Sequence, residues 1–188
     1  MKVWLIRHGQ SETNSLGLWT GWLDTPLTER GREEAARVRD VLSGIRFDQI
    51  YSSDLCRATS TAEIALPGLA YVTSPLFREI NVGDLAGKPH RAVLDEQGKP
   101  MNTDGYGCFG GESAQQFRER VMSVMRSLES ETGDHVAIFS HWGVIKQFLS
   151  LVLGMEIPKR RISGNNCLVA VFEYGNGQWS LHSWINLL

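Results

Sequence analysis

The sequence predicts an α/β fold with a mostly parallel central sheet, flanking helices and an antiparallel edge. Apolar runs bounded by turn residues alternate along the chain with segments of helical periodicity, and this order favours a layered α/β architecture. We expect strands over residues 3–6, 49–52, 136–139, 168–173 and 178–185, and helices over residues 28–43, 54–66, 113–130 and 142–153. A glycine-containing turn at 174–177 joins the last two strands, so they should form a hairpin at the antiparallel edge.

Capping residues and apolar spacing define the predicted helices. Thr28 is a candidate N-cap, Val38 belongs to an apolar set with helical spacing, and Gly44 marks a stop. Ser113 follows a pair of glycines and is a candidate cap for the third helix, whose apolar face includes Phe117. Helices with one apolar face are expected to cover a sheet.

The composition is that of an ordinary globular protein. The 188 residues suit one domain covering 1–188, and the formal net charge of −2 gives no overall positive field for nucleic acid or anionic lipid. No apolar run approaches the ~20 residues of a membrane-spanning helix. The three cysteines have no C-x-x-C spacing, which argues against a disulfide framework and a zinc site. We therefore expect a reduced, cytoplasmic protein.

Residues 85–111 differ from the rest of the chain, because they combine weak periodicity with many glycines. Long irregular insertions of this kind are often lids or binding loops, so we expect this one to cover a site and to set its selectivity.

At the C-terminal end of the chain, the edge strand of the predicted hairpin would support a homodimer.

Three predicted strands end in the same kind of residue. Arg7 and His8 follow the first strand, Arg57 follows the second, and His141 follows the third. If these strands are parallel, their ends share one edge, where α/β sheets bind ligands. Each residue alone has a structural explanation, but two guanidiniums and two imidazoles from three segments predict an oxyanion site. A phosphoryl group fits it, and a histidine can be the nucleophile.

A carboxylate completes the expected chemistry. Glu79 precedes the insertion, and beside a dianionic phosphate like charge favours its protonated form. It is therefore a candidate acid for a leaving oxygen, although an isolated glutamate is usually a solvated surface residue.

Five segments resemble, in the same order, the motifs of the histidine phosphatase superfamily, also called the phosphoglycerate mutase-like family. They are LIRHGQSETN at 5–14, GWLDTPLTERG at 21–31, YSSDLCRA at 51–58, FREINVG at 77–83 and SHWGVI at 140–145. The resemblance covers nearly the whole chain and implies a three-layer α/β/α sandwich of the phosphoglycerate mutase-like type. It implies neither a metal nor an organic cofactor.

The resemblance also implies roles for individual residues. His8 would be the nucleophile that becomes phosphorylated, and Arg7, Arg57 and His141 would hold the phosphoryl group. Glu79 would protonate the leaving oxygen and then activate water. Further phosphate or substrate contacts are implied at Asn14, Gln10, Ser11, Thr20 and Gly21. Because cationic neighbours disfavour imidazolium, we expect the pKa of His8 to lie below its ordinary value.

The predicted reaction is hydrolysis of a small phosphomonoester. The run around Glu79 is similar to that of the phosphatases, and in particular to α-ribazole phosphatases and broad-specificity phosphatases. Two alternatives stay open: mutase-type phosphoryl transfer and a non-catalytic phospho-ligand binding protein. Two departures from the family pattern, Ala86 in place of a carboxylate and Lys146 in place of a frequent arginine, put the substrate in question.

Four aromatic residues offer stacking surfaces to a nucleoside-like leaving group, although such rings mostly serve packing. They are Trp19, Trp22, Tyr106 and Phe109.

Overall fold

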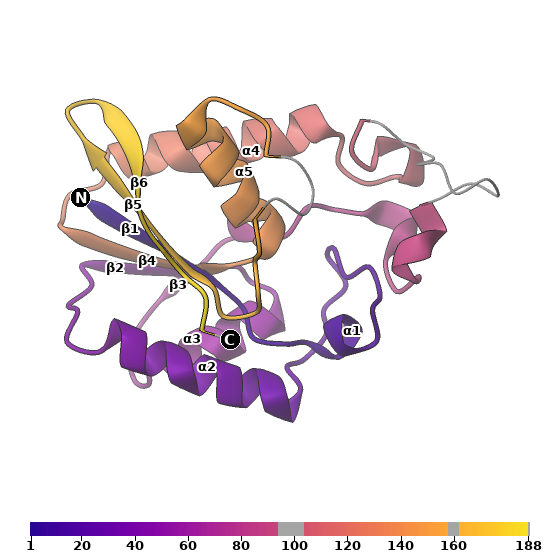
Figure 1. The fold of residues 1–188 in the computed structure, drawn as a ribbon, viewed down its shortest axis with the longest axis horizontal. Helices are drawn as coiled ribbons and strands as arrows, with labels where there is room; N and C mark the ends of the chain where they lie inside the picture. The colour runs from indigo at the N-terminus through magenta and orange to yellow at the C-terminus, as the bar shows by residue number, and fades with distance from the viewer. Residues whose placement is uncertain (94–103, 158–161, 188) are drawn as a thin grey trace.

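The computed structural model describes residues 1–93, 104–157 and 162–187. Its centre is a six-stranded sheet in the order β3-β2-β4-β1-β5-β6 (Figure 1). The strands are β1 (Lys2–Arg7), β2 (Gln49–Ser52), β3 (Val72–Thr73), β4 (His135–Ser140), β5 (Val169–Gly175) and β6 (Gln178–Ile185). The first four are parallel, whereas β5 pairs antiparallel with both β1 and β6. This confirms the predicted mostly parallel sheet with an antiparallel edge.

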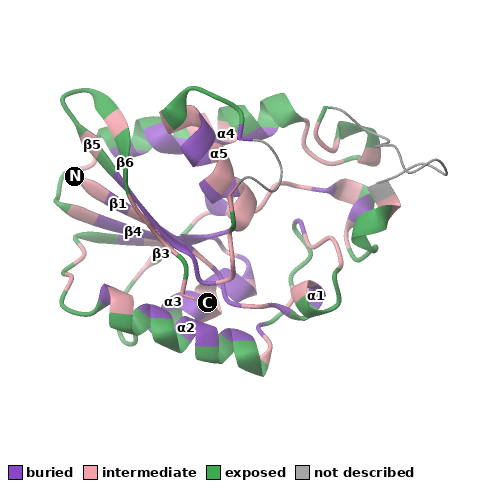
Figure 2. Cartoon of the chain, viewed as in Figure 1, coloured by how far each residue is buried: buried purple, intermediate pink, exposed green. Residues whose placement is uncertain are grey.

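Helices cover both faces of the sheet, giving three layers. They are α1 (Glu12–Ser15), α2 (Glu29–Leu42), α3 (Cys56–Ala65), α4 (Ala114–Glu129) and α5 (Trp142–Leu153). Figure 1 shows α2 and α3 on one side of the sheet and α4 and α5 on the other. A separate hydrophobic cluster fills each side, and the strands between them are mostly buried (Figure 2). The sheet therefore has no solvated face along its central strands, as expected for parallel strands.

Local chemistry explains where the helices begin. The Thr28 hydroxyl accepts the backbone N–H of Gly31 at the start of α2. Ser113 and Gln116 form a reciprocal capping box at the start of α4. Helix α3 begins at Cys56, two residues later than predicted, because the Ser53 hydroxyl accepts the N–H of Leu55 and holds that turn extended.

Sequence periodicity missed the smallest elements. Helix α1 has four residues and strand β3 has two exposed residues, both too short to generate a pattern. The register places Arg7 of β1 opposite Ser140 of β4, and Ser52 of β2 opposite Phe139 of β4. The carboxyl ends of these three strands therefore lie at one edge, as the sequence predicted.

The expected insertion at 85–111 lies partly outside the described residues, which stop at 93 and resume at 104. Its described ends pack against the loop after α1: Trp19 exchanges backbone hydrogen bonds with Gly87 and Lys88, and its ring contacts those of His90 and Tyr106. The role of the insertion as a lid stays a prediction. Within the described ranges, no helix is long and apolar enough to cross a membrane.

Candidate active site

The two histidines predicted from separate strand ends lie side by side. His8 follows β1 and its backbone N–H bonds to the carbonyl of Ser140, the last residue of β4. His141 is the next residue and the N-cap of α5. The centroids of the two rings are 5.1 Å apart, with the planes at 60°. Parallel pairing of β1 and β4 thus produces the imidazole pair directly.

The tautomer of His8 follows from its hydrogen bond. Its Nδ1 lies 2.6 Å from the carbonyl oxygen of Gly9. A carbonyl only accepts, so Nδ1 carries the proton and Nε2 of the neutral ring keeps a free electron pair. Burial, followed by the charges of Arg57 and Arg7, holds the pKa of His8 well below its ordinary value. The predicted direction of this shift is confirmed, and the ring is neutral at neutral pH.

The turn after His8 is locked to the segment that carries Arg57. The Gly9 N–H donates to the hydroxyl of Thr61 at 3.1 Å, and that hydroxyl donates to the carbonyl of Arg57 at 2.7 Å. Gly9 also lies against the backbone of Gly31, where a side chain would collide with the carbonyl. Thr61 was not predicted, because a buried threonine on a helix gives no chemical signal in a sequence.

Both predicted arginines are fixed by backbone carbonyls. Arg57 is fully buried and donates to the carbonyl oxygens of Leu23 at 2.9 Å and Gly21 at 2.8 Å. Arg7 donates to the carbonyl of Gly164. Burial lowers the pKa of Arg57 to about 10, which still leaves it charged at neutral pH. Carbonyl partners do not neutralise the guanidiniums, so the positive charge is held for an anion.

Three buried side-chain nitrogens have no hydrogen-bond partner in the described part of the chain, and all three belong to predicted site residues. They are Nε of Arg7, Nε of Arg57 and Nδ1 of His141. Each of these nitrogens can donate to an oxyanion when it carries a proton.

Ser53 is the hydrogen-bond partner of the His141 ring. The Ser53 hydroxyl lies 2.9 Å from Nε2 of His141 and also accepts the N–H of Leu55 at 3.3 Å. The hydroxyl can donate to Nε2 or accept from it, so the direction of this bond depends on which ring nitrogen carries the proton. Burial, with the charge of Arg57 next, holds the pKa of His141 well below its ordinary value. Ser53 stands inside the YSSDLCRA motif, but the sequence did not single it out.

Glu79 reaches the same site from the segment before the insertion. Its carboxylate oxygens accept the N–H of Ile80 at 2.9 Å and the N–H of Gly143 at 3.1 Å, in the first turn of α5. A side chain at Gly143 would collide with that carboxylate. The negative charge of Glu79 opposes the effect of burial on the pKa of both Arg7 and Arg57.

Some of the residues predicted to contact phosphate or substrate lie beside His8, and others lie in the loops that support the site. The Asn14 side chain accepts from Asn166, which also donates to the carbonyl of His8, so Asn14 lies next to the nucleophile segment. Ser11 is buried and caps α1, where its hydroxyl accepts the N–H of Asn14. Gly21 contributes the carbonyl that holds Arg57. Asn166 was not predicted from the sequence.

Thr20 and Gln10 have partners of their own. The Thr20 hydroxyl pairs with that of Thr13 at 2.7 Å, and the Gln10 amide oxygen accepts from Thr28 at 2.9 Å. Both residues stay predictions as substrate contacts.

No group of three or more histidine, cysteine or acidic residues able to hold a metal occurs among the described residues. Cys56, Cys108 and Cys167 are all free.

Two buried histidines together with two arginines and a carboxylate form a site that fits an oxyanion such as a phosphoryl group. The family model described as histidine phosphatase superfamily (branch 1) matches residues 3–187. The chain belongs to this superfamily, which confirms the resemblance carried by its five motifs.

Relatives with two kinds of name match this chain. An adenosylcobalamin/alpha-ribazole phosphatase of Escherichia coli (strain K12) is 32% identical, covering 82% of this chain and 80% of its own length. A probable phosphoglycerate mutase, GpmB, of Yersinia pestis (strain Pestoides F) is 31% identical, covering 98% of this chain and 90% of its own. The crystal structure of the alpha-ribazole phosphatase from Shigella flexneri aligns with a TM-score of 0.81 at 28% identity, covering 98% of this chain and 96% of that one. The phosphatase class agrees with the prediction.

Proposed function

We propose that this protein hydrolyses small phosphomonoesters through a phosphohistidine formed at Nε2 of His8. The observation that carries the proposal is the free electron pair of Nε2, in a buried site that also holds two arginines and a second histidine. In the proposal, N–H groups of Arg7, Arg57 and His141 bind the phosphoryl oxygens and do not compete for phosphorus.

In the first step, Nε2 of His8 attacks phosphorus and the bond between phosphorus and the ester oxygen breaks. The electron pair of that bond goes to the leaving oxygen, which takes a proton from Glu79. In the second step, Glu79 removes a proton from water, and the resulting hydroxide oxygen bonds to phosphorus. The bond from phosphorus to His8 breaks, inorganic phosphate leaves, and Glu79 and His8 return to their starting states.

The arginines and His141 do not exchange protons in this scheme. Their N–H groups hold the three non-bridging oxygens in place and stabilise the charge that spreads over them in the transition state. Because these donors are already buried and oriented, they need no reorganisation at the moment of transfer. In this scheme Glu79 gives one proton to the leaving oxygen and takes one back from water.

Alpha-ribazole 5′-phosphate is the first substrate to test, because two similar proteins are named as phosphatases of alpha-ribazole. The second candidate is phosphoglycerate mutase activity, since GpmB matches over nearly the whole chain. A mutase must return the phosphoryl group to substrate rather than to water. A binding protein without activity is the third alternative, and the retained nucleophile, acid and cations argue against it.

The direct test follows p-nitrophenyl phosphate hydrolysis in the presence of a chelator and then a panel of phosphomonoesters. The panel includes alpha-ribazole 5′-phosphate, phosphoglycerates, sugar phosphates and nucleotides. Labelling of the protein that is acid-labile, alkali-stable and absent from His8→Ala would support the phosphohistidine. Absence of turnover on every ester from mildly acidic to mildly alkaline pH would reject hydrolysis. Interconversion of phosphoglycerates faster than phosphate release would favour the mutase.

The proposal also includes the cellular setting, the oligomeric state and the domain boundaries. Free cysteines agree with a reduced, cytoplasmic setting, and β6 is the edge strand through which a homodimer would form. One domain covering 1–188 agrees with the family match over 3–187. Sedimentation analysis of the purified chain would test the homodimer.

A further inference from the structure

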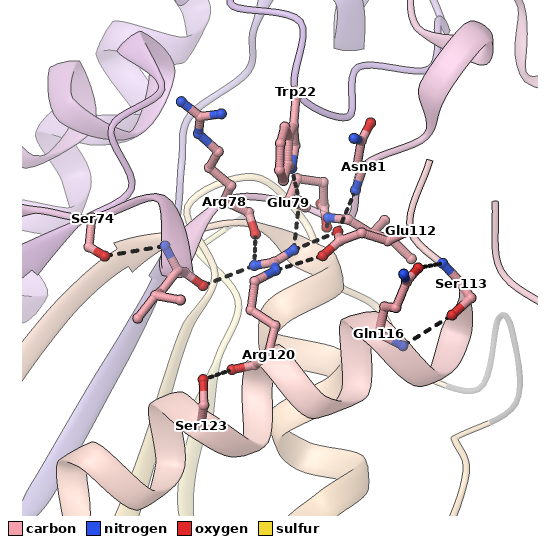
Figure 3. A network of polar contacts seen from close by, with 12 residues as sticks. Trp22, Ser74, Arg78, Glu79, Asn81, Glu112, Ser113, Gln116, Arg120 and Ser123 are labelled. Carbon is pink, nitrogen blue, oxygen red and sulfur yellow. Dashed lines mark hydrogen bonds and ion pairs between the residues drawn. The ribbon is translucent and has the colours of Figure 1, made fainter. Parts of the chain in front are cut away.

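Arg120 of α4 points toward the segment of Arg78 and Glu79 and uses every N–H donor of its guanidinium (Figure 3). Its Nε and Nη2 donate to the two carboxylate oxygens of Glu112, each at 2.8 Å. Its Nη1 donates to the carbonyls of Leu76 at 2.9 Å and Arg78 at 2.8 Å, and Nη2 also donates to the carbonyl of Glu79 at 3.1 Å. Three of these five bonds hold the backbone that ends at the proposed catalytic acid.

Glu112 extends the same anchor to the other side of Glu79. One oxygen of its carboxylate accepts the N–H of Asn81 at 2.7 Å while it pairs with Arg120. The side chains of Glu112 and Arg120 are only 14% and 12% exposed, so solvent screens this pair much less than a surface pair. The pair thus fixes the chain at 76, 78, 79 and 81, on both sides of the acid.

A second anchor reaches Glu79 from the opposite direction. The indole N–H of Trp22 donates to the same Glu79 carbonyl at 2.7 Å, and the guanidinium of Arg78 lies 4.9 Å from the centre of the Trp22 ring. Arg78 is in turn held by both carboxylate oxygens of Asp54. The main chain of Glu79 is therefore held from both sides, and its side chain extends from that fixed point to the N–H of Gly143.

We propose that the Arg120–Glu112 pair is a positioning device for the acid–base carboxylate of Glu79. The inference rests on the proposed function, because it concerns the proton that Glu79 gives to the leaving oxygen. Proton transfer needs the carboxyl group within hydrogen-bond reach of that oxygen. A displacement of about 1 Å at a reacting group can cost on the order of a hundredfold in rate. Neither Arg120 nor Glu112 needs to touch the substrate to exert this effect.

Two substrates with different leaving groups can distinguish whether Arg120 and Glu112 position Glu79 or only support the fold. An ester with a very acidic leaving group, such as p-nitrophenyl phosphate, departs with little help from an acid, whereas an alkyl phosphate such as β-glycerol phosphate depends on it. The comparison uses kcat/KM, because this quantity reports the transfer to His8 and not the later hydrolysis. Loss of a positioning residue should lower kcat/KM for the alkyl ester selectively, whereas general damage to the site lowers both values together.

The experiment compares wild type with Arg120→Met, Arg120→Lys, Glu112→Gln and the reference variant Glu79→Gln. Lysine keeps the charge but has three donors without the planar fork, so it cannot replace five bonds. Arg118→Met, an exposed arginine on the same helix, is the matched control. Circular dichroism and thermal unfolding identify any variant that does not fold. If Arg120→Met does not fold, Arg120→Lys and Glu112→Gln are compared with the wild type instead.

We expect Glu79→Gln to lose about 10²–10⁴-fold in kcat/KM on the alkyl ester, the range that proton transfer supplies, and far less on p-nitrophenyl phosphate. The Arg120 variants should lose about tenfold or more on the alkyl ester relative to p-nitrophenyl phosphate, and Arg118→Met should keep the wild-type ratio. If folded Arg120 and Glu112 variants lose both activities equally or neither, the pair does not position the acid and the inference is overturned. If Glu79→Gln itself shows no selectivity, the proposed role of Glu79 fails independently.

Discussion

Ser53 Oγ and His141 Nε2 lie 2.9 Å apart in a fully buried contact between the end of β2 and the end of β4. The hydroxyl also accepts the N–H of Leu55. On the other side of the ring, Nδ1 of His141 has no hydrogen-bond partner among the described residues. In the proposed mechanism the Ser53 hydroxyl donates to Nε2, so that Nδ1–H is directed at a phosphoryl oxygen.

Replacing Ser53 with alanine should weaken catalysis without removing any group that binds phosphate. Loss of one hydrogen bond to a buried partner costs about 1–3 kcal/mol, and ~1.4 kcal/mol corresponds to tenfold in rate. We expect kcat/KM on p-nitrophenyl phosphate to fall by roughly five- to a hundredfold in Ser53→Ala. Ser123→Ala, an exposed serine that bonds only within α4, is the control. Unchanged kcat/KM in a folded Ser53→Ala protein would show that the orientation of His141 does not depend on this hydroxyl.

Replacing Arg57 should have a larger effect, because its guanidinium is buried and preorganised by the carbonyls of Gly21 and Leu23. Removal of one preorganised donor to a transition-state anion costs about 2.7–4 kcal/mol. We expect Arg57→Ala to lose two to three decades in kcat/KM in steady-state assays. Arg32→Ala, an exposed arginine of α2, should retain activity. A loss below about tenfold in Arg57→Ala would make this residue peripheral.

The charge of Arg57 should also shift the pH dependence of kcat/KM. The attacking form of His8 is neutral, and the charge of Arg57 lowers the pKa of His8. The acidic limb of kcat/KM should therefore lie below pH 6.5 in the wild type. Arg57→Lys keeps a charge in place, whereas Arg57→Ala removes it, so the limb should move to higher pH in the alanine variant. A limb at the same pH in both variants would contradict this electrostatic coupling.

The free energy of unfolding should depend on pH because of His8 and His141. His8 and His141 have pKa values below the ordinary 6.5 in the folded state, so the unfolded chain takes up their protons first as the pH falls. Their stabilising contribution is complete above pH 6.5 and is lost as the pH falls toward the folded-state values, by up to about 1.4 kcal/mol per pH unit for each group. Urea unfolding between pH 7.5 and 5 should therefore show a smaller slope in His8→Asn and His141→Asn. Parallel curves for wild type and both variants would contradict the assignment.

The sequence predicted which residues meet in the candidate site, because four of them follow predicted strands. Arg7, His8, Arg57 and His141 each follow a short apolar run, and parallel strands necessarily bring those ends together. Glu79 was different: it does not follow a predicted strand, so it was proposed from the need for a proton donor and then supported by the resemblance to the family.

The residues that hold the candidate site in place could not be predicted from the positions of the strands. Arg120 donates to carbonyls of a distant segment, Thr61 accepts the N–H of Gly9, and Ser53 contacts the ring of His141. These partners depend on how the helices pack against the sheet. In the sequence Arg120 is one of three arginines on an amphipathic helix. The periodicity of the insertion at 85–111 is too weak for its path to be derived.

Gly143 offers the sharpest test of the contact between Glu79 and α5. Its N–H donates to the carboxylate at 3.1 Å, and a methyl group in its place would overlap that carboxylate and push it away. Because Gly143 does not have a positive φ, alanine causes no backbone strain there, and the effect of Gly143→Ala should come from the displaced acid. We expect kcat/KM to fall by about tenfold or more on an alkyl phosphate, within the range that proton transfer supplies, and by less on p-nitrophenyl phosphate. Gly175→Ala, where a methyl group meets open space, is the matched control. Equal loss on both esters would mean that Gly143→Ala disturbs the phosphoryl site itself rather than the proton donor.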